Sequence, residues 1–439
     1  MIARIEPGLL SGTVPAIASK SMAHRLIIAA ALSNSETHVI CNTTCADIEA
    51  TIRCLGALGA KIDTVEDGFT VKPIVKSSQL GILKAFCGGT LDCGESGSTL
   101  RFMLPVACAL GADATFIGSG RLGARPLSPL SEELIAGGCD LQGLGGFPLK
   151  ETGRLKPGTF KLPGNISSQY ISGLLLAAPV LGKPVTVEVE GFVESKPYIK
   201  LTIQALRQFG VDVSVETRKE TSENPAITRY TTSGLPYTTP GEVKVEGDWS
   251  NAAFWLCAGA LSDRTVTVEG ISLTSAQGDR NILAALSRFG ARILRSTDAA
   301  TIRPDKIVGF QMSAKDIPDL VPVISAVAAF AKGTTFVNDC ARLRIKESDR
   351  LETTSHELRA LGARIIVEGD SLIACGQEQL PGGIVSSHND HRIAMMAAVA
   401  ATRCSGSVEI HGAEAVNKSY PSFFEHFKLL GGNVTLIEE

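Results

Sequence analysis

Charged and hydroxyl side chains recur at one kind of position in this sequence: the start of strongly apolar segments of helical length. They are Lys20, Ser21, Ser98, Arg101, Ser167, Ser168, Gln169, Asp319, His391 and Arg392. Capping alone accounts for Ser, Asn and Asp at such positions. It does not account for lysine or arginine, which the positive end of a helix dipole repels. A bound anion would offset that repulsion, so the pattern predicts a phosphate or carboxylate site.

The segment RLRIKESDR at 342–350 concentrates basic and acidic groups. One interpretation is a solvated helix start. The other places Lys346 and Arg350 four residues apart on one helical face, with Glu347 beside them. Such a face would present two cations and a carboxylate to an anionic ligand.

Two other motifs match nucleotide-binding or acyl-transfer patterns only in part. GSGRLG at 118–123 fits GxGxxG, but a dinucleotide fingerprint opens a helix at once, and here Pro126 and Pro129 follow. The motif is therefore predicted to be a loop. GESGS at 94–98 lacks the GxSxG elbow, and no Ser-His-Asp order accompanies it, which argues against acyl transfer.

Cysteine and histidine spacing predicts no metal site. The eleven cysteines contain no CxxC pair, and the expected state is reduced, mostly buried thiols. His388 and His391 lie three apart without a third His or a Cys nearby. The start lacks the long apolar region of a signal peptide, and the longest uncharged run, 162–182, is too polar to span a membrane.

The composition is that of a globular protein of several domains. The chain has 439 residues, and 44% are hydrophobic and 20% charged. At roughly 100–200 residues per domain, two to four domains are expected. A net charge of −3 gives no chain-wide basic signal for nucleic acid. We expect no nucleic-acid partner, no membrane association and a cytoplasmic monomer.

An internal repeat organises the elements that carry these residues. A helix end, a glycine and a β-branched or leucine start recur about every 70 to 80 residues. The marker glycines are Gly59, Gly138, Gly210, Gly290, Gly362 and Gly431. Each is predicted to end a helix with a positive φ and to precede a strand.

The apolar segments alternate with these amphipathic helices. Segments such as MAHRLIIAAAL and RIAMMAAVAA are apolar nearly all round and predict buried helices. Each repeat thus holds two helices and several strands, such as TVTVEG at 265–270 and RIIVEG at 364–369. Six repeats divide naturally into three plus three, with a hairpin and a crossing in the polar stretch 216–243.

Ten segments, in this order along the chain, resemble the 5-enolpyruvylshikimate-3-phosphate synthase family. They are SKSMAHR, DCGESGSTLR, ARPLSPL, GNISSQYISGLLLAAP, ESKPYIK, GDWS, IPDL, LRIKESDR, NDHR and NKSYPSFF. The resemblance implies an α/β fold, a two-lobed inside-out α/β barrel of six βαβαββ repeats, three per domain. It also implies a discontinuous lobe of 1–18 plus 244–439, a second lobe of 19–243, and an active site in the cleft between them.

The resemblance implies transfer of the enolpyruvyl group of phosphoenolpyruvate to the 5-hydroxyl of shikimate 3-phosphate, with release of phosphate. No cofactor and no metal are implied. The two substrates bring roughly −5 to −6 of charge, at about −1.5 to −2 per phosphate plus the carboxylates. A site for them requires several cations, and the family's position in aromatic amino acid biosynthesis makes such a protein a glyphosate target.

Site residues follow from the family motifs. The shikimate 3-phosphate set is Lys20, Ser21, Arg25, Ser167, Ser168, Gln169, Ser195, Tyr198, Asp319 and Lys346. The phosphoenolpyruvate set is Lys20, Gly97, Arg125, Gln169, Arg350, Arg392 and Lys418. The catalytic set is Asp319 for the 5-hydroxyl proton, Glu347 for the methylene proton, and Lys20.

Three positions depart from the family pattern: Glu95 replaces an asparagine, Ser98 a threonine, and Arg342 an asparagine found in some members. One alternative is the sister enzyme that transfers enolpyruvate to UDP-N-acetylglucosamine. That enzyme typically has a loop cysteine where this chain has Gly120. The other alternative is a non-catalytic anion-binding protein, in which the carboxylates would be structural.

Overall fold

The computed structural model describes residues 1–74, 87–221, 225–303 and 305–438. It divides into two compact units. Unit 1 comprises Met1–Ser19 and Glu246–Glu439, and unit 2 comprises Lys20–Val245. The boundaries expected from the sequence lie one and two residues away from these.

One arrangement of strands and helices occurs six times in the described part of the chain. Each copy runs strand, helix, strand, helix, strand, strand, and forms its own four-stranded sheet. The first two strands pair in parallel, and the last two pair antiparallel with each other. In every sheet the order is first, second, fourth, third, as for β10-β11-β13-β12. The predicted βαβαββ repeat, three to a unit, is thus confirmed.

Unit 2 contains three copies. The first is β14 (Glu242–Lys244), α1 (Lys20–Ala31), β3 (Thr37–Ile40), α2 (Ala46–Ala57), β4 (Lys61–Val65) and β5 (Gly68–Lys72). The second is β6 (Thr90–Asp92), α3 (Gly97–Leu110), β7 (Thr115–Ile117), α4 (Leu130–Ala136), β8 (Cys139–Gln142) and β9 (Leu149–Gly153). The third is β10 (Thr159–Pro163), α5 (Ser168–Ala177), β11 (Thr186–Glu190), α6 (Lys196–Gln208), β12 (Val213–Arg218) and β13 (Ile227–Thr232).

Unit 1 contains the other three. The fourth copy is β2 (Gly12–Pro15), α7 (Trp249–Leu261), β15 (Val266–Glu269), α8 (Ile282–Phe289), β16 (Arg292–Arg295) and β17 (Ala299–Arg303). The fifth is β18 (Gln311–Ser313), α9 (Val321–Ala328), β19 (Thr334–Asn338), α10 (Arg350–Ala360), β20 (Arg364–Glu368) and β21 (Ser371–Cys375). The sixth is β22 (Gly383–Ser386), α11 (His391–Ala401), β23 (Val408–His411), α12 (Phe423–Leu429), β24 (Asn433–Ile437) and β1 (Ile2–Glu6).

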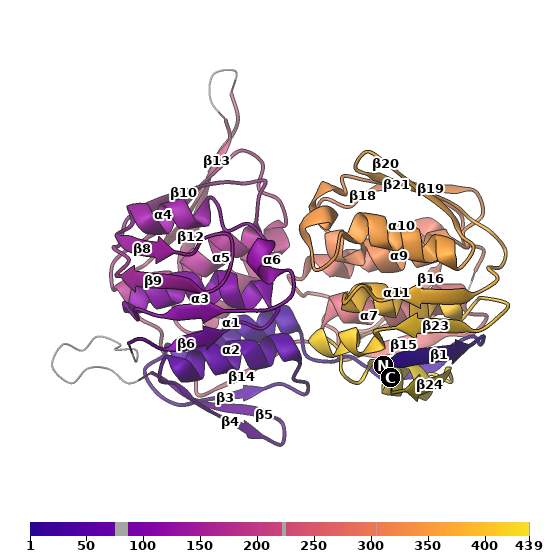
Figure 1. The fold of residues 1–439 in the computed structure, drawn as a ribbon, viewed down its shortest axis with the longest axis horizontal. Helices are drawn as coiled ribbons and strands as arrows, with labels where there is room; N and C mark the ends of the chain where they lie inside the picture. Colours follow the sequence, from indigo (N-terminus) through magenta and orange to yellow (C-terminus); the bar gives the residue numbers. More distant parts are fainter. Residues whose placement is uncertain (75–86, 222–224, 304, 439) are drawn as a thin grey trace. The chain divides into compact units, whose positions relative to one another are not determined.

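Three strands complete sheets that lie far from them in the sequence. β1 inserts between β23 and β24, so the two chain ends lie side by side (Figure 1). β2 pairs in parallel with β15, and β14 pairs in parallel with β3. These pairings tie both ends of the chain into unit 1 and close unit 2 on itself.

All six marker glycines have the predicted positive φ, between 75° and 106°. Each lies between a helix and the next strand, as Gly290 lies between α8 and β16 with φ 105°. Positive φ is a conformation that glycine adopts without the steric clash of a Cβ atom. The repeat recognised in the sequence is therefore a repeated helix stop.

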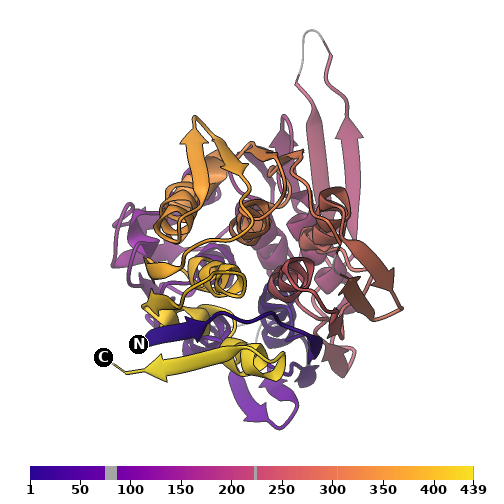
Figure 2. The same ribbon diagram turned by 90° about the vertical axis from the view of Figure 1, so that its right-hand side faces the viewer.

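The apolar helices are buried and the sheets lie outside them. In unit 1, α7, α9 and α11 pack against one another, and Figure 2 shows helices inside this unit and strands around them. Trp255 of α7 stacks on Phe423 with ring centroids 4.7 Å apart, and both side chains are fully buried. Burial on all sides explains why these helices show no polar face in the sequence.

The smaller sequence predictions have mixed outcomes. GSGRLG is a loop with a short 3-10 turn at Leu122–Ala124, as predicted, and α4 begins only at Leu130. β12 and β13 form the predicted hairpin, and residues 222–224 of that stretch lie outside the described residues. β14 still belongs to unit 2, and the chain passes to unit 1 after Val245, two residues beyond the predicted stretch. Lys346 and Arg350 do not share a helical face, because a 3-10 turn spans Ala341–Ile345 and α10 starts at Arg350. That part of the prediction was wrong.

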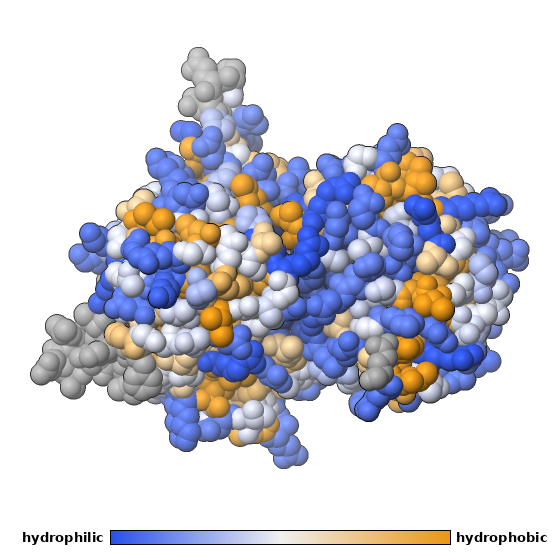
Figure 3. All heavy atoms as spheres, viewed as in Figure 1, coloured by the Kyte–Doolittle hydropathy of each residue, from blue (hydrophilic) through white to orange (hydrophobic). Residues whose placement is uncertain are grey.

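The surface and the thiols fit a globular protein. Nine of the eleven cysteines are buried, and all eleven are free thiols. Hydrophobic residues on the visible face are scattered among hydrophilic ones (Figure 3). Among the described helices, none is both long enough and apolar enough to cross a bilayer.

Candidate active site

The start of α1 in unit 2 carries Lys20, whose charge is paired within the unit. Lys20 Nζ lies 2.7 Å from Asp47 Oδ2, and both side chains are mostly buried. Asp47 lies in the first turn of α2, where a carboxylate is favoured by the helix dipole. Asp47 thus offsets the repulsion between Lys20 and the positive end of α1. Sequence reasoning missed this residue, although an acid in a first helical turn was visible.

Arg25 is turned into the protein and joins α1 to α6. Its guanidinium donates to Thr202 Oγ1 at 2.7 Å, to the Ser21 carbonyl at 2.6 Å and to the Tyr198 carbonyl at 3.1 Å. Burial lowers its pKa to about 9, and the residue is only 2% exposed. Arg25 therefore fixes the start of α1 relative to the start of α6.

The starts of α3 and α5 meet through a polar network. Gln169 of α5 donates from Nε2 to Ser98 Oγ at 2.9 Å and accepts from Arg101 Nη1 at 3.2 Å. Arg101 also donates to the Pro126 carbonyl at 3.1 Å. The network brings residues of SGSTLR, GARP and SSQ together.

Gly97 lies directly beside two of these guanidiniums. A Cβ atom at this position would lie 2.5 Å from Arg125 Nη1 and 2.6 Å from Arg101 Nη1. Separations below 3.0 Å require something to move, and here the nearest atoms are the ends of flexible side chains. The absence of a side chain at Gly97 therefore gives Arg125 its present position over the start of α3.

The starts of α6 and α5 provide serine hydroxyls, and the backbone at the start of α6 is constrained. Ser195 caps α6 with φ 51° and ψ 37° and is 1% exposed. A non-glycine residue held in this left-handed region stores of order 1–3 kcal/mol of strain, which is common at functional sites. Ser167 accepts from the Gln169 N–H at 3.3 Å as the cap of α5, and Ser168 is the first residue of that helix.

The side chain of Glu95, which stands where the family often has an asparagine, extends toward Gly120. A Cβ atom on Gly120 would collide with Glu95 Oε1. The Glu95 carboxylate therefore lies against the backbone of Gly120, in the space where a side chain at position 120 would begin. The Glu95 carboxylate, two residues before Gly97, is thus directed toward the 118–123 loop.

In unit 1, Asp319 is the centre of a second cluster. Its Oδ1 lies 2.8 Å from Arg350 Nη1, 3.2 Å from Lys346 Nζ and 3.8 Å from Arg392 Nε. Asp319 lies in the 3-10 turn Pro318–Leu320 that leads into α9. Lys346 and Arg350 thus face one carboxylate although they do not share a helix.

Asp390 holds Arg350 from the other side. Arg350 donates to Asp390 Oδ2 from Nε at 2.7 Å and to Asp390 Oδ1 from Nη2 at 3.1 Å. Asp390 also caps α11 by accepting from the Arg392 N–H at 3.0 Å. Arg350 has a raised pKa: burial opposes its charge, but Asp390, Glu347 and Asp319 outweigh that effect. Asp390 was not predicted as a site residue, although it stands in NDHR.

Glu347 lies between a cation and an imidazole. Its Oε1 is 3.3 Å from Arg350 Nη2, and its Oε2 is 2.9 Å from His391 Nδ1. Arg392 donates to the Asp319 carbonyl at 3.2 Å, and Lys418 donates to the Asn389 carbonyl at 2.5 Å. Unit 1 therefore brings five of its six predicted site residues into one cluster of ion pairs: Asp319, Lys346, Glu347, Arg350 and Arg392. The sixth, Lys418, contacts the backbone of Asn389, next to Asp390.

Burial changes two proton affinities in this cluster. It lowers the pKa of Lys346 to about 8, opposed by Asp319 and assisted by Arg350 and Arg342. Arg342 therefore acts on the cluster through its charge. Burial, with repulsion from Asp319, raises the pKa of Asp279 to about 6. Asp279 is a further group that sequence reasoning missed, because no motif marks it.

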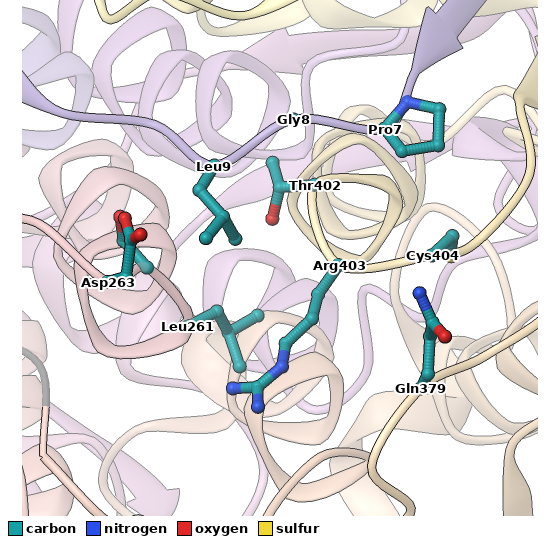
Figure 4. Close-up of a pocket in the computed structure, with 10 residues that line it drawn as sticks. Pro7, Gly8, Leu9, Leu261, Asp263, Gln379, Thr402, Arg403 and Cys404 are labelled. Atoms are coloured by element: carbon teal, nitrogen blue, oxygen red, sulfur yellow. The ribbon is translucent and has the colours of Figure 1, made fainter.

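A separate hollow in unit 1 contains none of the predicted site residues. It has a volume of about 420 Å³ and is lined by Leu9, Leu261, Asp263, Arg403 and Cys404, among others (Figure 4). The candidate chemistry thus lies at the helix starts, away from this hollow.

In fold, the chain is similar to the enolpyruvyl transferases. It superposes on the crystal structure of an enolpyruvyl transferase from Streptomyces tendae with a TM-score of 0.73 and 18% identity, covering 99% of this chain and 98% of the other. An EPSP synthase structure from Acinetobacter baumannii gives a TM-score of 0.78 and 26% identity, covering 99% and 100%.

A sequence model of EPSP synthase (3-phosphoshikimate 1-carboxyvinyltransferase) matches residues 5–427, so the chain belongs to the EPSP synthase family. The 3-phosphoshikimate 1-carboxyvinyltransferase of Clostridium kluyveri is 38% identical over 431 residues, covering 98% of this chain and 97% of that protein. That of Clostridium acetobutylicum is 40% identical over 436 residues, with the same coverage. The chain is a transferase of the shikimate pathway.

Proposed function

We propose that the helix starts of unit 2 and the charged cluster of unit 1 bind shikimate 3-phosphate and phosphoenolpyruvate and transfer the enolpyruvyl group between them. The observation that carries the proposal is the convergence of Lys346, Arg350 and Arg392 on Asp319. Three cations around one carboxylate provide both anion binding and a proton acceptor.

Shikimate 3-phosphate is assigned chiefly to unit 2. Its phosphate would take the hydroxyls and N–H groups at the helix starts: Ser167, Ser168 and Gln169 of α5 and Ser195 of α6. Lys20, Ser21, Tyr198 and, from unit 1, Lys346 would complete the set. Arg25 acts as a positioning residue, because its N–H groups already bind Ser21, Thr202 and Tyr198.

Phosphoenolpyruvate is assigned to the arginines of both units. Arg350 and Arg392 would form a fork for its carboxylate, a planar geometry that lysine does not provide. Lys20, Arg125, Gln169 and Lys418 would bind its phosphate, and Gly97 would let it approach the α3 backbone. Arg350 is oriented for this by its two bonds to Asp390.

The proton steps divide between two carboxylates. Asp319 accepts the 5-hydroxyl proton as that oxygen forms a bond to C2 of phosphoenolpyruvate. Glu347 supplies a proton to C3 and gives a tetrahedral intermediate. Glu347 then takes a proton back from the C3 methyl group, which restores the C=C bond as the C2–O bond to phosphate breaks. The departing phosphate takes the proton held by Asp319, so both carboxylates return to their starting state and the transfer involves no oxidant or reductant.

Phosphate release tests the proposal directly. Purified protein mixed with both substrates should release one phosphate for each enolpyruvyl ether formed, and neither substrate alone should suffice. Release of phosphate only with UDP-N-acetylglucosamine as the acceptor would show that the protein has the activity of the sister enzyme instead. Binding of both ligands without release would indicate an anion-binding protein.

The two units are proposed to close around the substrates. In this proposal both units present helix starts to the same anions, and positive helix ends brought close together would repel one another until a ligand offset the charge. Small-angle scattering should show a smaller radius of gyration with saturating shikimate 3-phosphate, and an unchanged radius would contradict closure. A cytoplasmic monomer is the proposed state, and sedimentation equilibrium tests its mass.

A further inference from the structure

One group of metal-ligating side chains lies outside the proposed substrate residues. His356 and Glu357 are neighbours on α10, and His388 lies in the loop between β22 and α11. One nitrogen of each imidazole and a carboxylate oxygen of Glu357 lie within 4.8 Å of one another. His356 Nδ1 is 2.7 Å and His388 Nε2 is 2.5 Å from the same atom, Glu357 Oε1.

We propose that His356, Glu357 and His388 form a binding site for a divalent transition metal of the zinc class. Two imidazoles and one carboxylate are a ligand set that zinc accepts at about 2.0–2.2 Å, with water in the fourth position. Small outward shifts of the three ligand atoms from their present spacing would make room for the ion.

The carboxylate is prepared for this role by its surroundings. The Glu357 side chain is 3% exposed, whereas those of His356 and His388 are 72% and 37% exposed. Its second oxygen, Oε2, accepts from the Ser386 N–H at 2.9 Å. A hydrogen bond of this kind orients a ligand oxygen toward a metal. The exposed imidazoles leave a path for the ion from solvent.

The site would also fix a constrained loop. His388 and Asn389 have φ angles of 50° and 55°, in the left-handed region that non-glycine residues seldom adopt. The next residue is Asp390, which holds Arg350, and the Asn389 carbonyl accepts from Lys418. A metal on His388 would therefore stiffen the segment that leads into the unit 1 cluster.

Direct metal binding tests the proposal on tag-free, chelator-treated protein. Zinc added in equilibrium dialysis should bind at one ion per chain, and cobalt should give the visible absorption of a low-symmetry four-coordinate site. His356→Ala and His388→Ala should each weaken zinc binding at least tenfold. His356→Ala is the safer variant because that side chain is mostly exposed.

The matched control is His38→Ala, which removes a single imidazole–carboxylate pair, with Asp67, in unit 2. Its zinc affinity should equal that of the unaltered protein. Hydrogen exchange at residues 387–390 should slow on zinc addition in the unaltered protein and not in His388→Ala. Absence of binding at 100 μM zinc, or binding that persists in both histidine variants, would overturn the proposal and leave Glu357 as an ordinary partner of two imidazoles.

Discussion

The two charged regions of this protein use their cations differently. In unit 2, Arg25 and Arg101 donate to hydroxyl, carbonyl and amide oxygens, which carry no full charge. In unit 1, Lys346 and Arg350 lie against the carboxylates of Asp319, Glu347 and Asp390. Unit 2 therefore suits the binding of a phosphate, while unit 1 also holds groups that accept or give a proton.

The two regions should respond differently to substitution. Removing a cation from unit 2 should mainly weaken anion binding. Removing a carboxylate from unit 1 should affect proton transfer and leave cations without their partner. Lys20 is the intermediate case, because it lies in unit 2 but pairs with Asp47.

The largest expected effect is on turnover. Asp319→Asn and Glu347→Gln should each lower kcat roughly 100-fold or more, because each removes a proton acceptor or donor while keeping its shape. Calorimetry should show shikimate 3-phosphate affinity within a few-fold of the unaltered protein. Asp263→Asn, in the separate hollow of unit 1, serves as the control. A variant that lost shikimate 3-phosphate affinity but kept its kcat would show that the residue binds substrate and does not transfer a proton. The two units would then differ less than described above.

Lys20→Ala should lose more than about 3 kcal/mol of transition-state stabilisation, or over 100-fold in kcat/KM. The reason is that Lys20 is assigned to both substrates from a mostly buried position. Steady-state kinetics measures the loss, with the exposed Lys61→Ala as control. A Lys20 variant with near-normal kcat/KM would show that its charge serves only Asp47.

Gly97→Ala in unit 2 should weaken the binding of the inhibitor glyphosate more than the binding of phosphoenolpyruvate. Since the added methyl would meet Arg125 and Arg101, those guanidiniums must shift. Overpacking by a methyl costs about 1–3 kcal/mol, or roughly 5- to 150-fold in affinity. We expect a glyphosate-sensitive enzyme whose inhibition constant rises by that range, while the phosphoenolpyruvate KM rises less.

Competitive inhibition against phosphoenolpyruvate gives both constants, and Gly158→Ala, with open space at its Cβ position, is the control. Equal losses for inhibitor and substrate would refute a selective clash. Insensitivity of the unaltered protein at millimolar glyphosate would contradict the expectation that the inhibitor binds beside Gly97.

A pH dependence should mark Lys346 in unit 1. Burial lowers its pKa to about 8, so its charge is lost as pH rises through that value. Affinity for shikimate 3-phosphate should therefore fall by up to about tenfold between pH 7 and pH 9. Lys346→Arg should flatten the profile because arginine stays charged. If the pH profile of shikimate 3-phosphate affinity were the same in Lys346→Arg, the pH dependence would arise from another group.

The smallest expected effect is on stability. Burial raises the pKa of Asp279 to about 6, so the folded state holds its proton more tightly than the unfolded state does. The contribution to stability is present at low pH and is lost as pH rises through about 6. Asp279→Asn should thus stabilise the fold by about 1 kcal/mol at pH 7.5 and by less at pH 5. Urea unfolding at both pH values measures this, and a gain that is larger at pH 5 would contradict it.

Much of the architecture was readable from the sequence because it is repeated and local. The six marker glycines required only the chemistry of a helix end, and all six have positive φ. The buried helices were visible as segments apolar on every side, which no exposed helix resembles. The helix starts likewise identified Lys20, Gln169 and Arg392 as site candidates before any contact was known.

The tertiary structure decided which of these residues meet. Lys346 and Arg350 converge on Asp319 from separate turns rather than from one helix, and Asp390 reaches Arg350 from 40 positions away. His388, predicted to lack ligand neighbours, lies beside His356 and Glu357 for the same reason. Local sequence determines how each segment folds, because caps and periodicity act within a few residues. Pairs of charges are brought together by packing between distant segments, and no local spacing encodes that distance.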